Sequence, residues 1–95
     1  MKIKLSKEAQ LVISELSTFV DSKNTAGAGK RFKKNFLLKI KNTLTTFSDH
    51  NDCKYPVFKA RGLRCFFIDK WVIAYKKEDD EIVVYVIVFG SLLQY

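Results

Sequence analysis

The chain has 95 residues, near the common size of a single folded domain. Hydrophobic residues make up 47% and aromatic residues 14%, with one proline and four glycines, so intrinsic disorder is excluded. One buried core is expected over residues 1–95. The formal net charge of +7 points to acidic or polyanionic partners.

The positive charge is concentrated in one segment. Residues 22–48 contain seven basic residues and no acidic one, so the other ten basic residues match the ten acidic ones. This local excess favours a polyanionic partner, nucleic acid or an acidic protein, through its field and through counterion release. A basic helix that only aids solubility is an equally good interpretation of the charge alone.

Residues 1–23 predict a short strand followed by an amphipathic helix. Ile3 and Leu5 alternate with lysines, which is typical of a strand with one buried face. Ser6 is a good N-cap residue, and Glu8 is favourable in the first helical turn. Apolar residues then recur at spacings of three and four, so the helix is expected to end near residues 21–23.

A second helix is predicted after the loop 24–29, and its first turn can begin within that loop. Phe32, Phe36 and Ile40 lie on one arc at helical spacing, which predicts an aromatic core face. No acidic residue lies one turn away to neutralise the opposite face. The basic residues on that opposite face are Lys30, Arg31, Lys34 and Lys41.

The chain changes to strand character after residues 48–55, a polar stretch closed by Pro56. Residues 57–60 are predicted as a short strand. The main strands are predicted at 63–68, 71–76 and 81–89, joined by tight hairpin turns. The sequence therefore predicts an α+β domain: a short N-terminal strand, a helical hairpin and an antiparallel meander sheet.

The last predicted strand is apolar on both sides. Alternation places Val83, Tyr85, Ile87 and Phe89 on one side of the strand. The other side carries Ile82, Val84, Val86 and Val88. If the helices cover one side, the other needs a cover too. Long side chains of neighbouring strands or a second protein chain can provide it.

Several kinds of site are excluded or not indicated. Asn24 and Arg31 occupy positions where a phosphate-binding loop needs Gly and Ser or Thr. Cys53 and Cys65 are too few for a disulfide framework or a tetrahedral metal site, so free thiols are expected. His50 lies in a polar stretch and is expected to be a solvated loop residue. No metal and no cofactor are expected.

The longest apolar run, residues 82–89, has the length of a strand and not of the roughly 20 residues that span a membrane. The N-terminus alternates polar and apolar residues and lacks the apolar core of a signal peptide. A cytoplasmic protein with no membrane partner is therefore expected.

Four segments share their order and spacing with a known family. They are residues 3–9 (IKLSKEA), 61–64 (RGLR), 71–75 (WVIAY) and 82–87 (IVVYVI). The second is similar to the Gly-Leu-Arg that leads into a strand of ParE-like toxins, and the third to the family's Tyr-Arg-Ile-Val-Tyr strand. Over nearly its whole length the chain resembles the RelE/ParE superfamily of toxins from bacterial type II toxin-antitoxin pairs.

The resemblance implies two partners, a cognate antitoxin and the ribosome with its messenger RNA. The antitoxin would cover the outer face of the last strand, at Val83, Tyr85, Ile87 and Phe89. RelE-like members inhibit translation by cleaving ribosome-bound messenger RNA, in which a 2′-hydroxyl attacks the adjacent phosphate. That reaction needs cations and a group that moves protons.

The resemblance also implies roles for individual residues. Arg64 and Tyr95 would be catalytic. Residues of the basic helix and of the segment before the sheet would bind nucleic acid. This nucleic-acid-binding set is Lys30, Arg31, Lys34, Lys41, Lys54, Lys59 and Arg61.

The end of the last strand departs from the family pattern. Residues 89–95 read FGSLLQY, whereas many members have His or Arg there. The sequence therefore leaves open a ParE-like toxin that inhibits DNA gyrase without chemistry, or a member that has lost activity. A plain RNA-binding module fits less well, because the aromatics of the basic helix are expected in the core.

Overall fold

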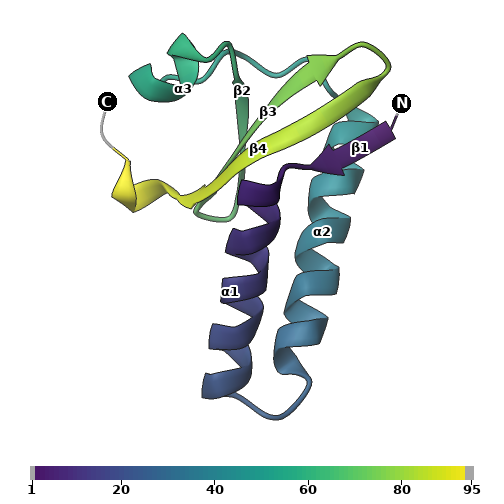
Figure 1. Ribbon diagram of the computed structural model, residues 1–95, viewed down its shortest axis with the longest axis vertical. Helices are drawn as coiled ribbons and strands as arrows, with labels where there is room; N and C mark the ends of the chain where they lie inside the picture. Colours follow the sequence, from purple (N-terminus) through teal and green to yellow (C-terminus); the bar gives the residue numbers. More distant parts are fainter. Residues whose placement is uncertain (1, 94–95) are drawn as a thin grey trace.

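The computed structural model describes residues 2–93 and shows a four-stranded sheet with two long helices on one face and a short helix on the other (Figure 1). The strand order is β1-β4-β3-β2, with β1 parallel to β4 and the other neighbours antiparallel. The predicted α+β class is confirmed. The elements are β1 (Lys2–Leu5), α1 (Lys7–Lys23), α2 (Ala28–Thr46), α3 (Pro56–Ala60), β2 (Arg64–Ile68), β3 (Trp71–Glu78), β4 (Glu81–Phe89) and a 3₁₀ turn (Gly90–Leu92).

The helix α1 begins at the predicted cap. The Ser6 hydroxyl accepts a hydrogen bond from the Ala9 amide at 3.1 Å, which satisfies one of the free donors of the first turn. The same hydroxyl donates to the Tyr85 carbonyl at 3.1 Å. The cap therefore also ties the start of α1 to β4.

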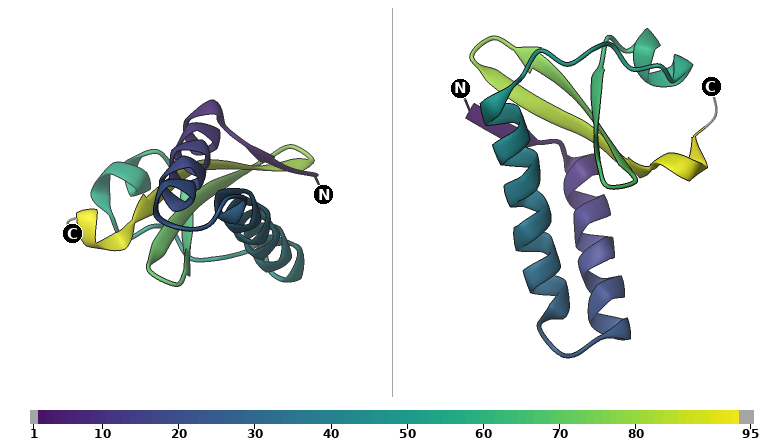
Figure 2. Two further views of the ribbon diagram at one scale, coloured as in Figure 1. Left: turned by 90° about the horizontal axis from the view of Figure 1, so that it is seen from below. Right: turned by 180° about the vertical axis from the view of Figure 1, so that it is seen from behind.

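The helices α1 and α2 form a hairpin that extends well beyond the sheet (Figures 1 and 2). Gly27 caps α2 in the left-handed conformation, with φ of 87°, which favours glycine. The Gly29 amide donates to the Asp21 carboxylate at 2.7 Å. A Cβ at Gly29 would lie 2.1 Å from the Ser17 carbonyl oxygen, so the two helices touch backbone to backbone there.

Apolar side chains pack on both faces of the sheet. On the helix side, Phe36 and Ile40 of α2 contact Ile73 and Tyr75 of β3 within one buried cluster. On the opposite side, a second cluster joins Phe58 of α3 with strand residues. The strand residues of this second cluster include Val72, Ala74 and Val86. The second apolar face of β4 is thus partly covered by the chain's own segment 53–63.

A β-bulge in β4 changes which residues share a face. Tyr75 pairs with Val84 whereas Ala74 pairs with Val86, so Tyr85 is the extra residue. Beyond the bulge the alternation is inverted: Ile87 is buried on the helix side and Tyr85 packs at the opposite cluster. The prediction that Val83, Tyr85, Ile87 and Phe89 form one outer face is therefore wrong.

The predicted strand at 57–60 is also wrong, because these residues belong to α3. Pro56 is the first residue of that helix, where its fixed φ and missing amide proton are favourable. The amides of Phe58 and Lys59 both donate to the Tyr55 carbonyl. The sequence pattern indicates that Pro56 ends the polar stretch before a strand, whereas in the structure Pro56 begins a helix.

Cys53 and Cys65 form a disulfide, which corrects the expectation of free thiols. Their Cα atoms lie 4.9 Å apart, because the segment before α3 runs beside the edge of β2. The Cys53 amide donates to the Leu63 carbonyl and the Cys65 amide to the Asn51 carbonyl. A spacing of twelve residues carries no signal for such a pairing in the sequence.

Candidate functional site

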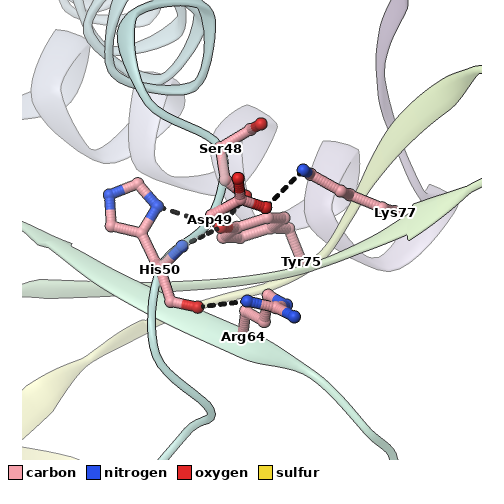
Figure 3. Close-up of polar contacts among 6 residues, drawn as sticks. All are labelled: Ser48, Asp49, His50, Arg64, Tyr75 and Lys77. Carbon is pink, nitrogen blue, oxygen red and sulfur yellow. Dashed lines mark hydrogen bonds and ion pairs between the residues drawn. The ribbon is translucent and has the colours of Figure 1, made fainter.

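The clearest polar cluster lies where the loop after α2 meets β3 (Figure 3). Its centre is the hydroxyl of Tyr75, a fully buried residue of β3. This hydroxyl donates to the Ser48 carbonyl at 2.7 Å and accepts from the His50 amide at 3.1 Å. The Nδ1 atom of His50 lies 2.9 Å from the same oxygen.

These contacts fix the tautomer of His50. The single proton of the Tyr75 hydroxyl is given to Ser48, so Nδ1 of His50 must be a donor toward that oxygen. The Nε2 atom then keeps its lone pair, and Figure 3 shows it on the side of the ring away from Tyr75. Burial, and next the positive charge of Arg64, lower the pKa of His50, so its ring is neutral at pH 7 and Nε2 can accept a proton.

Other side chains hold this loop in place. The Nη1 atom of Arg64 donates to the His50 carbonyl at 2.7 Å. Lys77 Nζ lies 2.5 Å from Oδ1 of Asp49, and this bond holds the pKa of that carboxyl below its usual range. The ring of Phe66 stacks on His50 with 5.0 Å between centroids. Arg64, predicted as catalytic, thus helps to position His50.

A hollow of about 220 Å³ lies between this loop and the edge of β2. His50 and Lys54 line it from the loop, and Phe67 lines it from β2. The hollow therefore joins a neutral imidazole, a lysine and an aromatic ring. A proton acceptor beside a cation is what phosphoryl chemistry on RNA requires.

The predicted nucleic-acid-binding residues fall into two groups. Lys30, Arg31, Lys34 and Lys41 are exposed on α2, on the helix side of the sheet. Lys54, Lys59 and Arg61 belong to the segment that covers the opposite side, where the Arg61 guanidinium lies 5.6 Å from the Tyr85 ring centroid. Of these seven residues only Lys54 lines the hollow with His50. Tyr95, the second predicted catalytic residue, is outside the described residues.

The residues predicted to bind an antitoxin are separated by the bulge. Val83 and Tyr85 are half-buried, Ile87 is buried, and the ring of Phe89 packs on Trp71 with 5.2 Å between centroids. A larger hollow, about 630 Å³, lies instead between α1 and α2. Its lining includes the apolar Leu5, Leu11 and Leu37 and the basic Lys7 and Lys33.

Sequence reasoning missed His50. The polar stretch around it indicated a solvated loop, and nothing in the spacing shows that Tyr75, distant in the sequence, holds its ring. Within residues 2–93, no group of three or more His, Cys, Asp or Glu side chains is placed to bind a metal ion. Over the same residues, no helix is long and apolar enough to cross a membrane.

No protein-family model matches the sequence, and no curated protein matches it either. Among solved structures, a chain from the "Chromosomal ParDE TA system from P. aeruginosa" superposes with a TM-score of 0.74 at 12% sequence identity. The match covers 94% of this chain and 95% of that chain. The chain has a ParE-like fold. The fold expected from the RelE/ParE resemblance is thereby confirmed over almost the whole chain.

Proposed function

We propose that this ParE-like chain is the toxin of a toxin-antitoxin pair, and that it inhibits translation by cleaving messenger RNA on the ribosome. The ParE-like fold supports the role of toxin. The observation that carries the reaction is the hollow at the edge of β2, which His50 and Lys54 both line while Tyr75 holds the Nδ1 atom of His50. An excess of cations on α2 supports a polyanionic target.

In the proposed reaction His50 is the general base. Its Nε2 takes the proton of a ribose 2′-hydroxyl, the 2′-oxygen bonds to the adjacent phosphorus, and the bond from phosphorus to the 5′-oxygen breaks. Water protonates the leaving 5′-oxygen. Lys54 stabilises the charge that develops on the phosphate oxygens. Arg64 acts as a positioning residue, because it binds the His50 carbonyl.

The proposed partner that silences the toxin is an antitoxin with an acidic, amphipathic segment. The hollow between α1 and α2 offers such a segment an apolar floor of leucines and two lysines for its carboxylates. Leu11 lines this hollow and is 60% exposed, so its side chain is available to a partner. We therefore place the antitoxin-binding surface at this hollow and not on the outer face of β4, which the bulge interrupts.

A non-enzymatic action on DNA gyrase is the second candidate. Two observations favour it: the similar solved chain comes from a ParDE system, and the described end of β4, residues 89–93, carries no acid or base. In this case the cations on α2 would contact the DNA-bearing complex, and His50 would only hold the loop.

Inducible expression of the full chain in a bacterial host tests the proposal. Wild type is expected to arrest growth and to produce new transcript ends while DNA stays intact. His50→Asn keeps a side-chain donor for Tyr75 but has no Nε2, so it is expected to lose cleavage while remaining folded. Lys76→Ala, an exposed change outside the hollow, is the matched control and should cleave like wild type.

The two candidates give opposite patterns in that experiment. DNA breaks with intact transcripts, unchanged by His50→Asn, would establish the gyrase candidate and overturn the cleavage reaction. Harmless expression of a folded chain in a host without an antitoxin would overturn the toxin proposal itself.

A further inference from the structure

Phe67 is an aromatic residue that does not belong to the buried core. It lies in the middle of β2, yet its side chain is 58% exposed. Its neighbours Phe66 and Ile68 are buried on the helix side, so Phe67 faces the other side of the sheet. There it shares a row with Val72 and Val88 and lies beyond the cover that α3 provides.

Two hollows flank Phe67, and each contains one lysine. The hollow of about 220 Å³ is lined by Phe67 and Lys54, and a second, of about 310 Å³, by Phe67 and Lys70. Each hollow also has one aspartate, Asp52 in the first and Asp69 in the second. Asp69 is 3.6 Å from Lys39 of α2, so its charge is partly compensated.

The surface is thus an exposed ring with one lysine in each of the two hollows that it lines. Single-stranded nucleic acid is recognised by stacking bases on aromatic side chains while nearby cations hold the phosphates. Charged residues are depleted at the centre of protein–protein interfaces, whereas here a lysine lines each of the hollows beside the ring. The excess charge of the chain lies in residues 22–48, so on this face Lys54 and Lys70 supply the attraction for phosphates.

We propose that Phe67 is the stacking platform for one base of a single-stranded nucleic acid, with the two adjoining phosphates bound by Lys54 and Lys70. The inference deepens the proposed function and rests on it for the identity of the strand as RNA. A stacked base would position the substrate, which His50 alone does not do. A base stacked on Phe67 orients its ribose beside the hollow that His50 lines.

The test measures binding of a short fluorescent single-stranded RNA, and of DNA with the same sequence, to the purified full chain by anisotropy. Phe67→Ala is expected to weaken binding of the RNA by about 5- to 150-fold, because one stacked base is lost. Phe67→Tyr keeps the ring and should bind like wild type. Phe19→Ala, which removes an equally exposed phenylalanine from α1, is the matched control and should not change the affinity.

The lysines are tested by salt dependence. Lys54→Ala and Lys70→Ala are each expected to lower the slope of log affinity against log salt by about 0.7, the value for one phosphate of a single strand. Thermal unfolding of each variant shows that it remains folded. Equal loss for RNA and DNA would show a site that reads single strands through the base alone, in support of the stacking role.

Two results would overturn the inference. One is a Phe67→Ala variant that binds RNA within twofold of wild type. The other is sedimentation in which the wild-type chain is a dimer that Phe67→Ala dissociates, since the ring would then be a self-association contact. If Phe67→Ala binds and cleaves normally while wild type arrests growth, only this inference fails. If RNA binding depends on Phe67 but expression is harmless, only the proposed function fails.

Discussion

Tyr75 is the residue through which the sheet holds the loop that carries His50. Its ring is fully buried, and its hydroxyl contacts the backbone of Ser48 and both the backbone and the ring of His50. Burial of this hydroxyl raises the pKa of Tyr75, so the group stays protonated and can always donate to Ser48. The availability of Nε2 in His50 therefore depends on a residue in another element.

Tyr75→Phe is expected to lower the free energy of unfolding by about 1–3 kcal/mol, because it leaves the Ser48 carbonyl and the His50 amide without their partner. Urea denaturation measures this loss. Tyr85→Phe is the control: its hydroxyl bonds only Glu78 near the surface, and the expected loss is below about 1 kcal/mol. Equal losses in the two variants would contradict the role of Tyr75.

The stability of the chain should fall as the pH falls below 6.5, the ordinary pKa of a histidine side chain. Burial lowers the pKa of His50 in the folded state, so between 6.5 and the folded pKa the unfolded chain binds the extra proton. The contribution is complete above pH 6.5 and is lost as the pH falls through the folded pKa. His50→Asn is expected to remove this part of the pH dependence in urea denaturation.

The same titration can be followed directly, because His50 is the single histidine of the chain. Its ring proton signals in NMR are therefore free of overlap with other histidines. A midpoint above 6.5 would contradict the burial and the effect of Arg64.

At the scale of elements, the helical hairpin depends on one close contact between α1 and α2. In an exposed helix, replacing Gly by Ala stabilises by about 1 kcal/mol. Gly29→Ala is expected to have the opposite sign and to destabilise by about 1–3 kcal/mol, because its Cβ would meet the Ser17 carbonyl. Thermal unfolding monitored by circular dichroism measures the change.

Gly62→Ala separates this clash from a purely conformational effect. Gly62 has φ of 73° and no atom within 4 Å of an added Cβ, so only the left-handed conformation opposes the substitution. A loss near 1 kcal/mol is expected there. A stabilised Gly29→Ala variant would show that the two helices do not touch at this point.

The elements that the sequence predicted correctly are those with local signals. The Ser6 cap, the helical spacing of Phe36 and Ile40, and the alternation in β3 each lie within one element. The features that the sequence did not predict depend on residues far apart in the chain, or on a residue that is compatible with two structures. Pro56 can end or begin a helix, and the pairing of Cys53 with Cys65 depends on backbone hydrogen bonds between two segments.

The candidate site was predictable only in part for the same reason. The resemblance indicates Arg64, which bonds the His50 carbonyl, and Lys54, which lines the hollow with His50. The tautomer of His50 and the exposure of Phe67 require the three-dimensional arrangement. The bulge at Tyr85 moves each following side chain of β4 to the opposite face of the sheet. Because the strand is apolar throughout, no pattern in the sequence marks the position of the bulge.

On the scale of the whole molecule, four cations of α2 are available to a partner, whereas Lys39 pairs with Asp69. Within residues 2–93 no ion pair involves Lys30, Arg31, Lys34 or Lys41. The hairpin that carries them projects beyond the sheet (Figure 2). A long polyanion can therefore contact both this hairpin and the opposite face near Lys54.

The double variant Lys30→Ala/Lys34→Ala is expected to lower the slope of log affinity against log salt by about 1.4 for a long single-stranded RNA, through the loss of two phosphate contacts. Filter binding at several salt concentrations gives the slope. Lys2→Ala/Lys76→Ala makes the same change in net charge elsewhere on the surface and should leave the slope nearly unchanged. Identical slopes in the two variants would show that only the total charge matters.

The parallel pairing of β1 with β4 has a consequence for how the chain is made. Residues 2–5 are synthesised well before residues 81–84, which are their partners, so β1 must wait for β4. The hairpin of α1 and α2 has only local contacts and can form early. The sheet lacks β4, which lies between β1 and β3, until residues 81–89 have been synthesised. A product that terminates before Glu81 therefore keeps its basic helices but lacks β4, the strand that joins β1 to β3, and cannot complete the fold.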